Sequence, residues 1–177
     1  DDAFVDAMRH VLRHPQLAPA FKELVLTLPS EAYVAETLAE VDPQRLHAVR
    51  EGMRAQLATR LHADWVWAWE THQVREGYRP DMAQSGARAL ANLALSMLCL
   101  HAVEVGDPVW PGRAYQRVKD AGNMTERLGA LRALVHAHAE LAQPALERFH
   151  AMFRGEALVI DKWFALQAGA PERDGAV

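Results

Sequence analysis

The sequence has only one cysteine and no excess of basic charge, and both shortages limit what the protein can do. Cys99 cannot form an internal disulfide, which fits a reducing compartment, and within the apolar run 93–100 it is interpreted as a small buried side chain. The 19 Lys and Arg residues against 23 Asp and Glu residues give a formal charge of −4. Because no face gathers Lys and Arg, we expect no nucleic acid partner.

Long hydrophobic runs and strand patterns are also missing. No apolar stretch reaches the roughly 18 to 20 residues that a membrane span needs, so no membrane partner is expected. Residues 1–4 (Asp-Asp-Ala-Phe) do not resemble a basic, apolar signal sequence and read like the middle of a longer protein. No strict apolar/polar alternation is bounded by turn signals, which argues against strands.

Helical periodicity runs through almost the whole chain instead. Half of the 177 residues are apolar and 24% are charged, which is typical of one folded domain. The prediction is an all-α fold, an irregular α-solenoid or superhelical array of short antiparallel helix pairs. No clean repeat is present, which disfavours a tetratricopeptide-type array. The helical domain is expected over residues 1–168, followed by a polar tail, 169–177, that frays.

Capping and breaking residues predict where the helices lie. Asp42-Pro43 and Asp81 are strong helix starts, because an aspartate side chain accepts from the free amides of the first turn and proline fits the first position. Gly77–Pro80 is the main linker, and the Ala/Leu-rich helix after it is expected to be central and buried on several sides. The expected helices are 3–13, 17–28, a short one after Ser30, 43–74 as one helix or two in line, 83–105, 112–121, 125–140, 144–153 and 157–168.

Apolar stripes predict which helix faces are buried. The second helix places Phe21, Leu24, Val25 and Leu28 on one stripe. The third is expected to carry the following four apolar residues: Tyr33, Val34, Leu38 and Val41.

Three histidine and carboxylate pairs have the spacing of metal ligands. His10 and His14 match the two histidines of a zinc helix, but Val11 stands where the general base belongs and no third ligand follows. His136 and Glu140 share a helix face without further ligands. Glu147 and His150 match one Glu-x-x-His element of a di-iron bundle, which needs two. His10 and His14 are interpreted as solvent-facing and Glu147 with His150 as surface salt-bridging residues, and no catalytic, cofactor-binding or metal residue is assigned.

Three tryptophans lie two residues apart in the fourth predicted helix. Trp65 and Trp69 fall on one face and Trp67 nearly opposite. They could form a stacking platform for a ligand. Burial of Trp65 and Trp69 in the core, with Trp67 at a second interface, needs no ligand and is the favoured interpretation.

Four short sequence motifs occur in an order that points to a known family. They are Leu28-Pro29-Ser30-Glu31-Ala32-Tyr33-Val34-Ala35-Glu36, then Val41-Asp42-Pro43, then Asn123-Met124-Thr125, and finally Ile160-Asp161-Lys162-Trp163-Phe164-Ala165-Leu166-Gln167-Ala168. Together they resemble the C-terminal helical domain of bacterial aminopeptidase N, a zinc metallopeptidase, over most of the chain. Each motif also has a structural role: Asn123 or Thr125 as a helix cap, and Trp163 with Phe164 as anchors of the last helix.

The resemblance implies a helical fragment, truncated at both ends, that packs on the catalytic domain of its own parent chain and limits access to the active-site chamber. It implies zinc, N-terminal cleavage of peptide substrates and a cytoplasmic location for the parent. This chain has no His-Glu-x-x-His motif and is expected to be inactive alone. The alternative is an independent helical adaptor that binds a partner protein in a concave groove.

Overall fold

The chain folds into helices throughout its described part. The computed structural model describes residues 2–171, and within this range it contains α-helices and no strand, which confirms the all-α prediction. The helices are α1 (Asp2–Arg13), α2 (Pro19–Leu26), α3 (Glu31–Glu36), α4 (Pro43–Arg60), α5 (His62–Thr71), α6 (Met82–Val105), α7 (Val109–Asp120), α8 (Met124–His136), α9 (Ala142–Phe153) and α10 (Ala157–Ala168).

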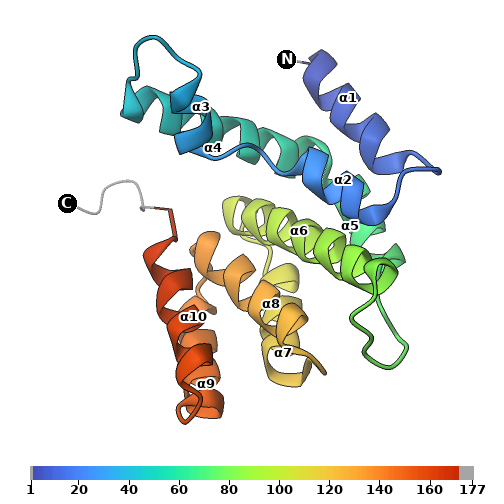
Figure 1. Cartoon of the computed structure of the whole chain (residues 1–177), viewed down its shortest axis with the longest axis vertical. Helices are drawn as coiled ribbons and strands as arrows, with labels where there is room; N and C mark the ends of the chain where they lie inside the picture. The colour runs from blue at the N-terminus through green and yellow to red at the C-terminus, as the bar shows by residue number, and fades with distance from the viewer. Residues whose placement is uncertain (1, 172–177) are drawn as a thin grey trace.

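Helix α6 is the centre of the array. Helices α2, α4 and α5 pack against it on one side and α7 and α8 on the other, while α9 and α10 extend the second side (Figure 1). This arrangement confirms a helical array of the solenoid type. Helix α10 ends at Ala168, and the expected fraying of the tail beyond it concerns mostly residues 172–177, which lie outside the described residues.

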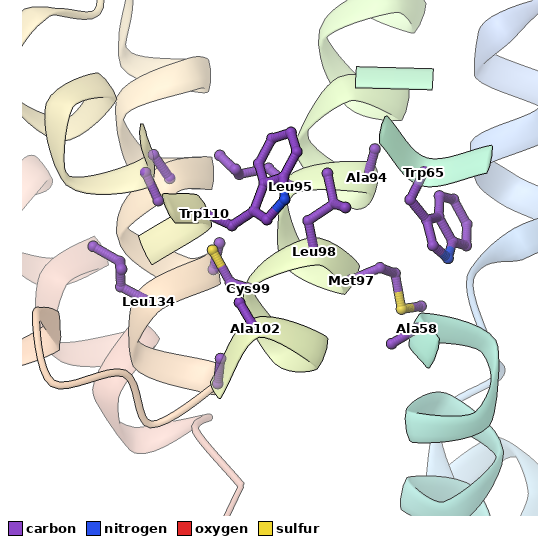
Figure 2. Packing of buried hydrophobic residues seen from close by; sticks show 14 of the residues in the cluster. Ala58, Trp65, Ala94, Leu95, Met97, Leu98, Cys99, Ala102, Trp110 and Leu134 are labelled. Carbon is purple, nitrogen blue, oxygen red and sulfur yellow. The ribbon is translucent and has the colours of Figure 1, made fainter. Parts of the chain in front are cut away.

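The core confirms that α6 is buried on several sides. Ala94 and Met97 face Trp65 and the end of α4, whereas Leu95 and Cys99 face α7 and α8 (Figure 2). By length and composition this helix could also cross a membrane, contrary to the sequence expectation that no stretch is long enough. Its packing partners on both sides account for its apolar character, because a helix that is apolar all round is the core helix of such an array.

The predicted helix starts are confirmed by their capping bonds. The side chain of Asp42 accepts from the amide of Arg45 at 3.1 Å, and that of Asp81 accepts from Gln84 at 2.8 Å. Ser30 caps α3 and Asn123 caps α8 in the same way. Local capping chemistry therefore determined these boundaries.

Other boundaries differ from the prediction for identifiable reasons. The pattern over 43–74 forms two helices, one of the two expected arrangements, because the backbone of Leu61 leaves the helical region, and the second of them ends at Thr71 rather than at residue 74. Helix α7 begins at Val109, because Pro108 and Pro111 fit its cap and first turn instead of breaking it. Helix α8 ends at His136 rather than at residue 140, since His138 adopts a left-handed backbone with φ 53°.

The apolar stripe predicted for α2 is wrong. Lys22 and Leu26 are its buried residues, while Phe21 is 50% exposed and Leu24 is 69% exposed. The third helix likewise ends at Glu36 and buries none of its residues. Phe21, Leu24 and Tyr33 are therefore exposed apolar side chains, whereas Leu26 belongs to the core.

Two glycines allow α6 to approach its neighbours closely. A Cβ at Gly86 would lie 2.9 Å from the backbone nitrogen of Ala20 in α2. A Cβ at Gly129 of α8 would lie 2.4 Å from the side chain of Asn92 in α6, which donates to the carbonyl of Thr125. The packing of α2 and α8 on α6 depends on these missing side chains.

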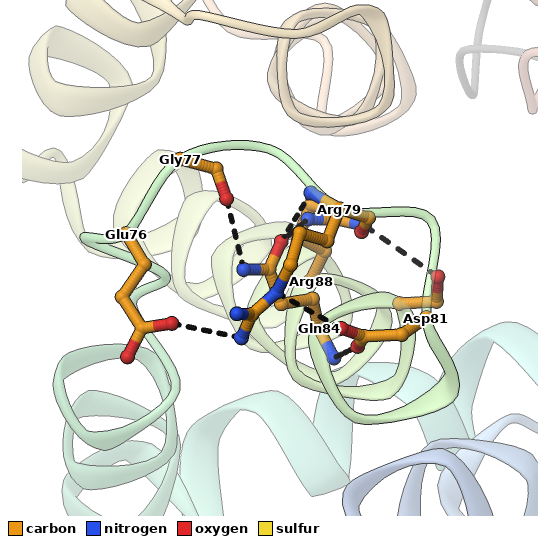
Figure 3. Close-up of polar contacts among 7 residues, drawn as sticks. Glu76, Gly77, Arg79, Asp81, Gln84 and Arg88 are labelled. Carbon is orange, nitrogen blue, oxygen red and sulfur yellow. Dashed lines mark hydrogen bonds and ion pairs between the residues drawn. The ribbon is translucent and has the colours of Figure 1, made fainter.

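A buried polar network fixes the linker before α6. The Arg88 guanidinium donates to Gln84 Oε1 and to the carbonyl of Arg79, each at 2.9 Å (Figure 3). Gln84 in turn accepts from the amide of Arg79 and donates to the carbonyl of Gly77. The Arg88 guanidinium also lies 4.7 Å from the centre of the Tyr78 ring. The linker is therefore held on the first turns of α6.

Candidate functional site

A groove of about 1170 Å³ lies between α4 and the ends of α6, α8 and α10. Leu100 and Val103 of α6 form an apolar floor, and Val103 is 39% exposed. The walls come from segments distant in sequence, which Figure 1 shows on either side of the C-terminal end of α6. The other lining residues are Glu31, Pro43, Gln44, His47, Ala48, Arg50, Glu51, Gly52, Ala55, His136, Ala137, His138, Gly169, Ala170 and Pro171.

The α4 wall of this groove is charged but internally paired. His47 Nδ1 lies 2.8 Å from a carboxylate oxygen of Glu31. Glu51 bridges Arg50 at 2.9 Å and Arg54 at 3.2 Å. The wall therefore offers polar contacts without a large field of one sign.

The opposite wall carries two histidines at the end of α8. His136 Nε2 donates to the carbonyl of Leu166 at 3.2 Å, and burial lowers the pKa of this histidine, with further lowering by the nearby Arg132 and Arg54. His138 Nε2 is buried and has no hydrogen-bond partner in the described part of the chain. Both rings are therefore held close to the helix ends. The ring of His136 is neutral near pH 7, because its pKa is lowered.

The groove can bind but its residues do not form a catalytic set. No nucleophile lies beside a general base in its lining, and the carboxylates already pair with Arg50, Arg54 and His47. An apolar floor with a polar rim is typical of a surface that takes a protein segment.

The zinc-helix pair lies at the edge of a different cavity. His10 and His14 line a space of about 360 Å³ beside α1, with their ring centres 5.5 Å apart. His14 Nδ1 accepts from the amide of Gln16. Within residues 2–171, no three His, Cys, Asp or Glu side chains are placed so that they could hold a metal ion.

The other two predicted pairs are separated or engaged elsewhere. His136 ends α8 and Glu140 lies beyond the break at His138, so the expected shared helix face does not exist. Glu147 accepts from Gln143 Nε2 at 2.9 Å. His150 instead packs its ring 5.1 Å from that of Trp163.

The three tryptophans occupy three different surroundings. Trp65 is fully buried and donates to the carbonyl of Leu57 at 3.0 Å. Trp69 is partly buried and lies edge-on to Trp110 of α7. Trp67 lies at a second interface, as expected, where the guanidinium of Arg13 is 4.3 Å from its ring centre. They do not form one stacking platform.

The last of the four sequence motifs, residues 160–168, anchors α10 through Trp163 and not through Phe164. Trp163 Nε1 donates to the carbonyl of Leu146 in α9 at 3.0 Å. Phe164 is 59% exposed, so its predicted anchoring role is wrong.

The groove residues His47 and His138, and the buried Lys22, carried no signal in the sequence, because only the tertiary fold brings them to their positions.

Comparisons with known proteins agree on one family. A family model described as "Domain of unknown function (DUF3458_C) ARM repeats" matches residues 1–177. An aminopeptidase N of Caulobacter vibrioides is 33% identical over 183 residues, covering 98% of this chain and 20% of that protein. One of Escherichia coli K12 is 32% identical over 166 residues, covering 94% and 18%.

A solved structure shares the fold. The crystal structure of Legionella pneumophila aminopeptidase A in complex with aspartic acid superposes with a TM-score of 0.80 at 24% identity, covering 97% of this chain and 21% of that one. The chain thus spans about a fifth of the length of the relatives it matches.

Proposed function

The chain belongs to the DUF3458_C family of ARM-repeat domains and corresponds to the C-terminal helical domain of aminopeptidase N, and from this premise we propose that it packs on the catalytic part of a zinc-dependent aminopeptidase. In this role it restricts access to the active-site chamber, while the parent releases N-terminal residues from peptides. Catalysis itself belongs to the remainder of the parent polypeptide.

The observation that carries the proposal is the exposed apolar arm, defined as residues 21–49. Phe21 and Leu24 of α2 are 50% and 69% exposed, although the sequence pattern placed both on one apolar stripe of that helix. The other exposed apolar side chains of this arm are Tyr33 at 64%, Leu38 at 46%, Val41 at 45% and Val49 at 54% exposure. An excess of exposed apolar side chains in one segment is what a surface covered by another protein surface requires.

The described residues do not fit zinc. Tetrahedral zinc needs at least three protein ligands, and His10 with His14 has no third donor at ligand distance. The proposed zinc ion therefore belongs to the catalytic part of the parent. A cytoplasmic location is proposed on the strength of the single buried thiol of Cys99.

The proposal is tested by adding this chain to the separately expressed remainder of the parent polypeptide. We expect the two parts to bind, and the ratio of kcat/KM for a long unstructured peptide to that for a dipeptide amide to fall on binding. A double variant, Phe21→Ser with Leu24→Ser, should bind more weakly, whereas Leu158→Ser on the 79% exposed Leu158 of α10 should not change binding. Absence of binding, or an unchanged ratio, would contradict the proposal.

The groove is the observation that favours an adaptor function as the second candidate. Its apolar floor and paired polar rim would suit a segment of an unrelated protein. An adaptor would exist as a free 19.7 kDa protein in cells and would not bind the catalytic part of an aminopeptidase.

A further inference from the structure

Lys22 is a largely buried lysine whose ammonium group has no counter-ion in the described part of the chain. Its side chain lies in α2, directed toward α5, and the residue is only 4% exposed. Within residues 2–171 no carboxylate or carbonyl oxygen pairs with its ammonium group. Burial of a charge without a partner is unfavourable, so such residues are rare unless something compensates for them.

The aromatic neighbour of Lys22 does not provide that compensation. The ammonium nitrogen lies 5.7 Å from the ring centre of Trp67, near the outer limit of a cation–π contact. The same ring already faces the guanidinium of Arg13 at 4.3 Å. One indole therefore serves two cations, and the closer one is Arg13.

The carboxylate at this corner is already shared by two arginines. Asp64 Oδ2 pairs with Arg9 at 3.2 Å and Asp64 Oδ1 with Arg13 at 2.7 Å. His72 also lies near Lys22, whose charge contributes to the lowering of the His72 pKa, after burial as the larger cause. Arg9 also pairs with Asp6, so the two arginines have two carboxylates, and the lowered pKa of His72 leaves its ring neutral near pH 7. Lys22 is therefore the group of this corner (Arg13, Lys22, Trp67 and His72) whose positive charge no carboxylate of the described part of the chain balances.

The amine of Lys22 is still reachable from outside. The buried side-chain atoms without a partner are His62 Nδ1, Trp69 Nε1, Asn92 Oδ1 and His138 Nε2, and Lys22 Nζ is not one of them. Beside Arg13 lies the cavity of about 360 Å³ that Arg9, His10, Arg13 and His14 line with Asp6 and Pro15. Arg13 thus belongs both to this cavity and to the corner.

We propose that the corner of Arg13, Lys22, Trp67 and His72 binds an aspartate or glutamate side chain from the catalytic part of the parent polypeptide. The carboxylate would accept from Lys22 Nζ and balance the charge that burial otherwise leaves unpaired. This inference rests on the proposed function, since it names the chemistry of one contact in the interface between the two parts.

The test compares Lys22→Met with wild type in two measurements. Methionine has a similar length and no charge, so it removes the ion pair without leaving a large cavity. In the chain alone, the melting temperature of Lys22→Met should be unchanged or higher, because an unpaired buried charge is lost. Binding to the separately expressed remainder should weaken by about tenfold or more, and the loss should shrink at high salt.

Controls separate a docking role from a structural one. Lys162→Met, on the exposed face of α10, should change neither measurement, and Lys22→Arg should keep most of the binding. A lower melting temperature for Lys22→Met, or binding equal to wild type, would overturn the inference while leaving the proposed function intact. If wild type itself does not bind the remainder, both are overturned.

Discussion

Individual polar side chains in this fold take their properties mainly from burial. Cys99 is fully buried between α6 and the α7–α8 pair, and burial raises the pKa of its thiol to about 12. Arg88 is also buried but stays charged, because its guanidinium donates to the amide oxygen of Gln84 and to the carbonyl of Arg79. Lys22 differs from both, because it is a largely buried amine without a hydrogen-bond acceptor in the described part of the chain.

The Cys99 thiol should be inert in the folded protein. A thiol held neutral and out of solvent cannot act as a nucleophile, so labelling by a disulfide reagent at pH 8 should be complete only after unfolding in urea. The measurement is the rate of thiol labelling with and without urea. Rapid labelling of the native chain would mean that α6 is not packed as described.

Capping residues were predictable from the sequence, whereas buried cations were not. The caps Asp42 and Asp81 act on amides three residues away, so local sequence suffices to find them. The burial of Lys22 depends on where α5 lies, which no local pattern reports. The apolar pattern alone therefore predicts the wrong buried face for α2.

Helix packing depends on two positions where a side chain is absent. Substitution of Gly86 by Ala should destabilise the fold by about 1 to 3 kcal/mol, because the new methyl group meets the backbone of Ala20, which cannot move aside easily. Gly52 in α4 is the matched control, since a Cβ there meets no atom within 4 Å. Gly52→Ala should stabilise by about 0.5 to 1 kcal/mol.

Urea unfolding of both glycine variants measures these effects. If Gly86→Ala were as stable as Gly52→Ala, the close contact of α2 with α6 would be incorrect.

Helix existence was predictable for all the described elements, but their ends depend on tertiary context. The central helix is clear from its Ala/Leu composition, and α6 begins one residue before the predicted position. The end of α8 was missed because His138 adopts a left-handed backbone without a glycine to signal it. The start of α7 was missed because its prolines were interpreted as breakers.

The whole molecule should lose stability below neutral pH. Burial is the first cause that lowers the pKa of His62, His72 and His136 below the ordinary value of 6.5. As the pH falls through 6.5, the unfolded chain takes up protons at these positions before the folded chain does. The free energy of unfolding should therefore fall between pH 7 and about pH 5.

Urea titrations across this pH range check that prediction. His136→Gln should show a smaller fall than wild type, and His10→Gln, at an exposed position of α1, should behave like wild type. Stability that rises as the pH is lowered would contradict the burial of these rings.

The shape of the whole array could be predicted as helical, but its groove could not. The groove forms where α4 stands opposite the ends of α8 and α10, segments that are distant in sequence. The exposed apolar arm was likewise invisible in the sequence, because the same apolar residues would mark a buried stripe in a self-contained bundle.

The central claim, that this chain acts as a domain of a larger zinc aminopeptidase, is tested most directly by the mass of the natural polypeptide. An antibody raised against the chain should detect, in cells that express the gene, a band about five times heavier than 19.7 kDa, since the chain covers 20% of its Caulobacter relative. That band should co-fractionate with aminopeptidase activity that a zinc chelator abolishes. A band at 19.7 kDa, separate from such activity, would contradict the account and favour the adaptor.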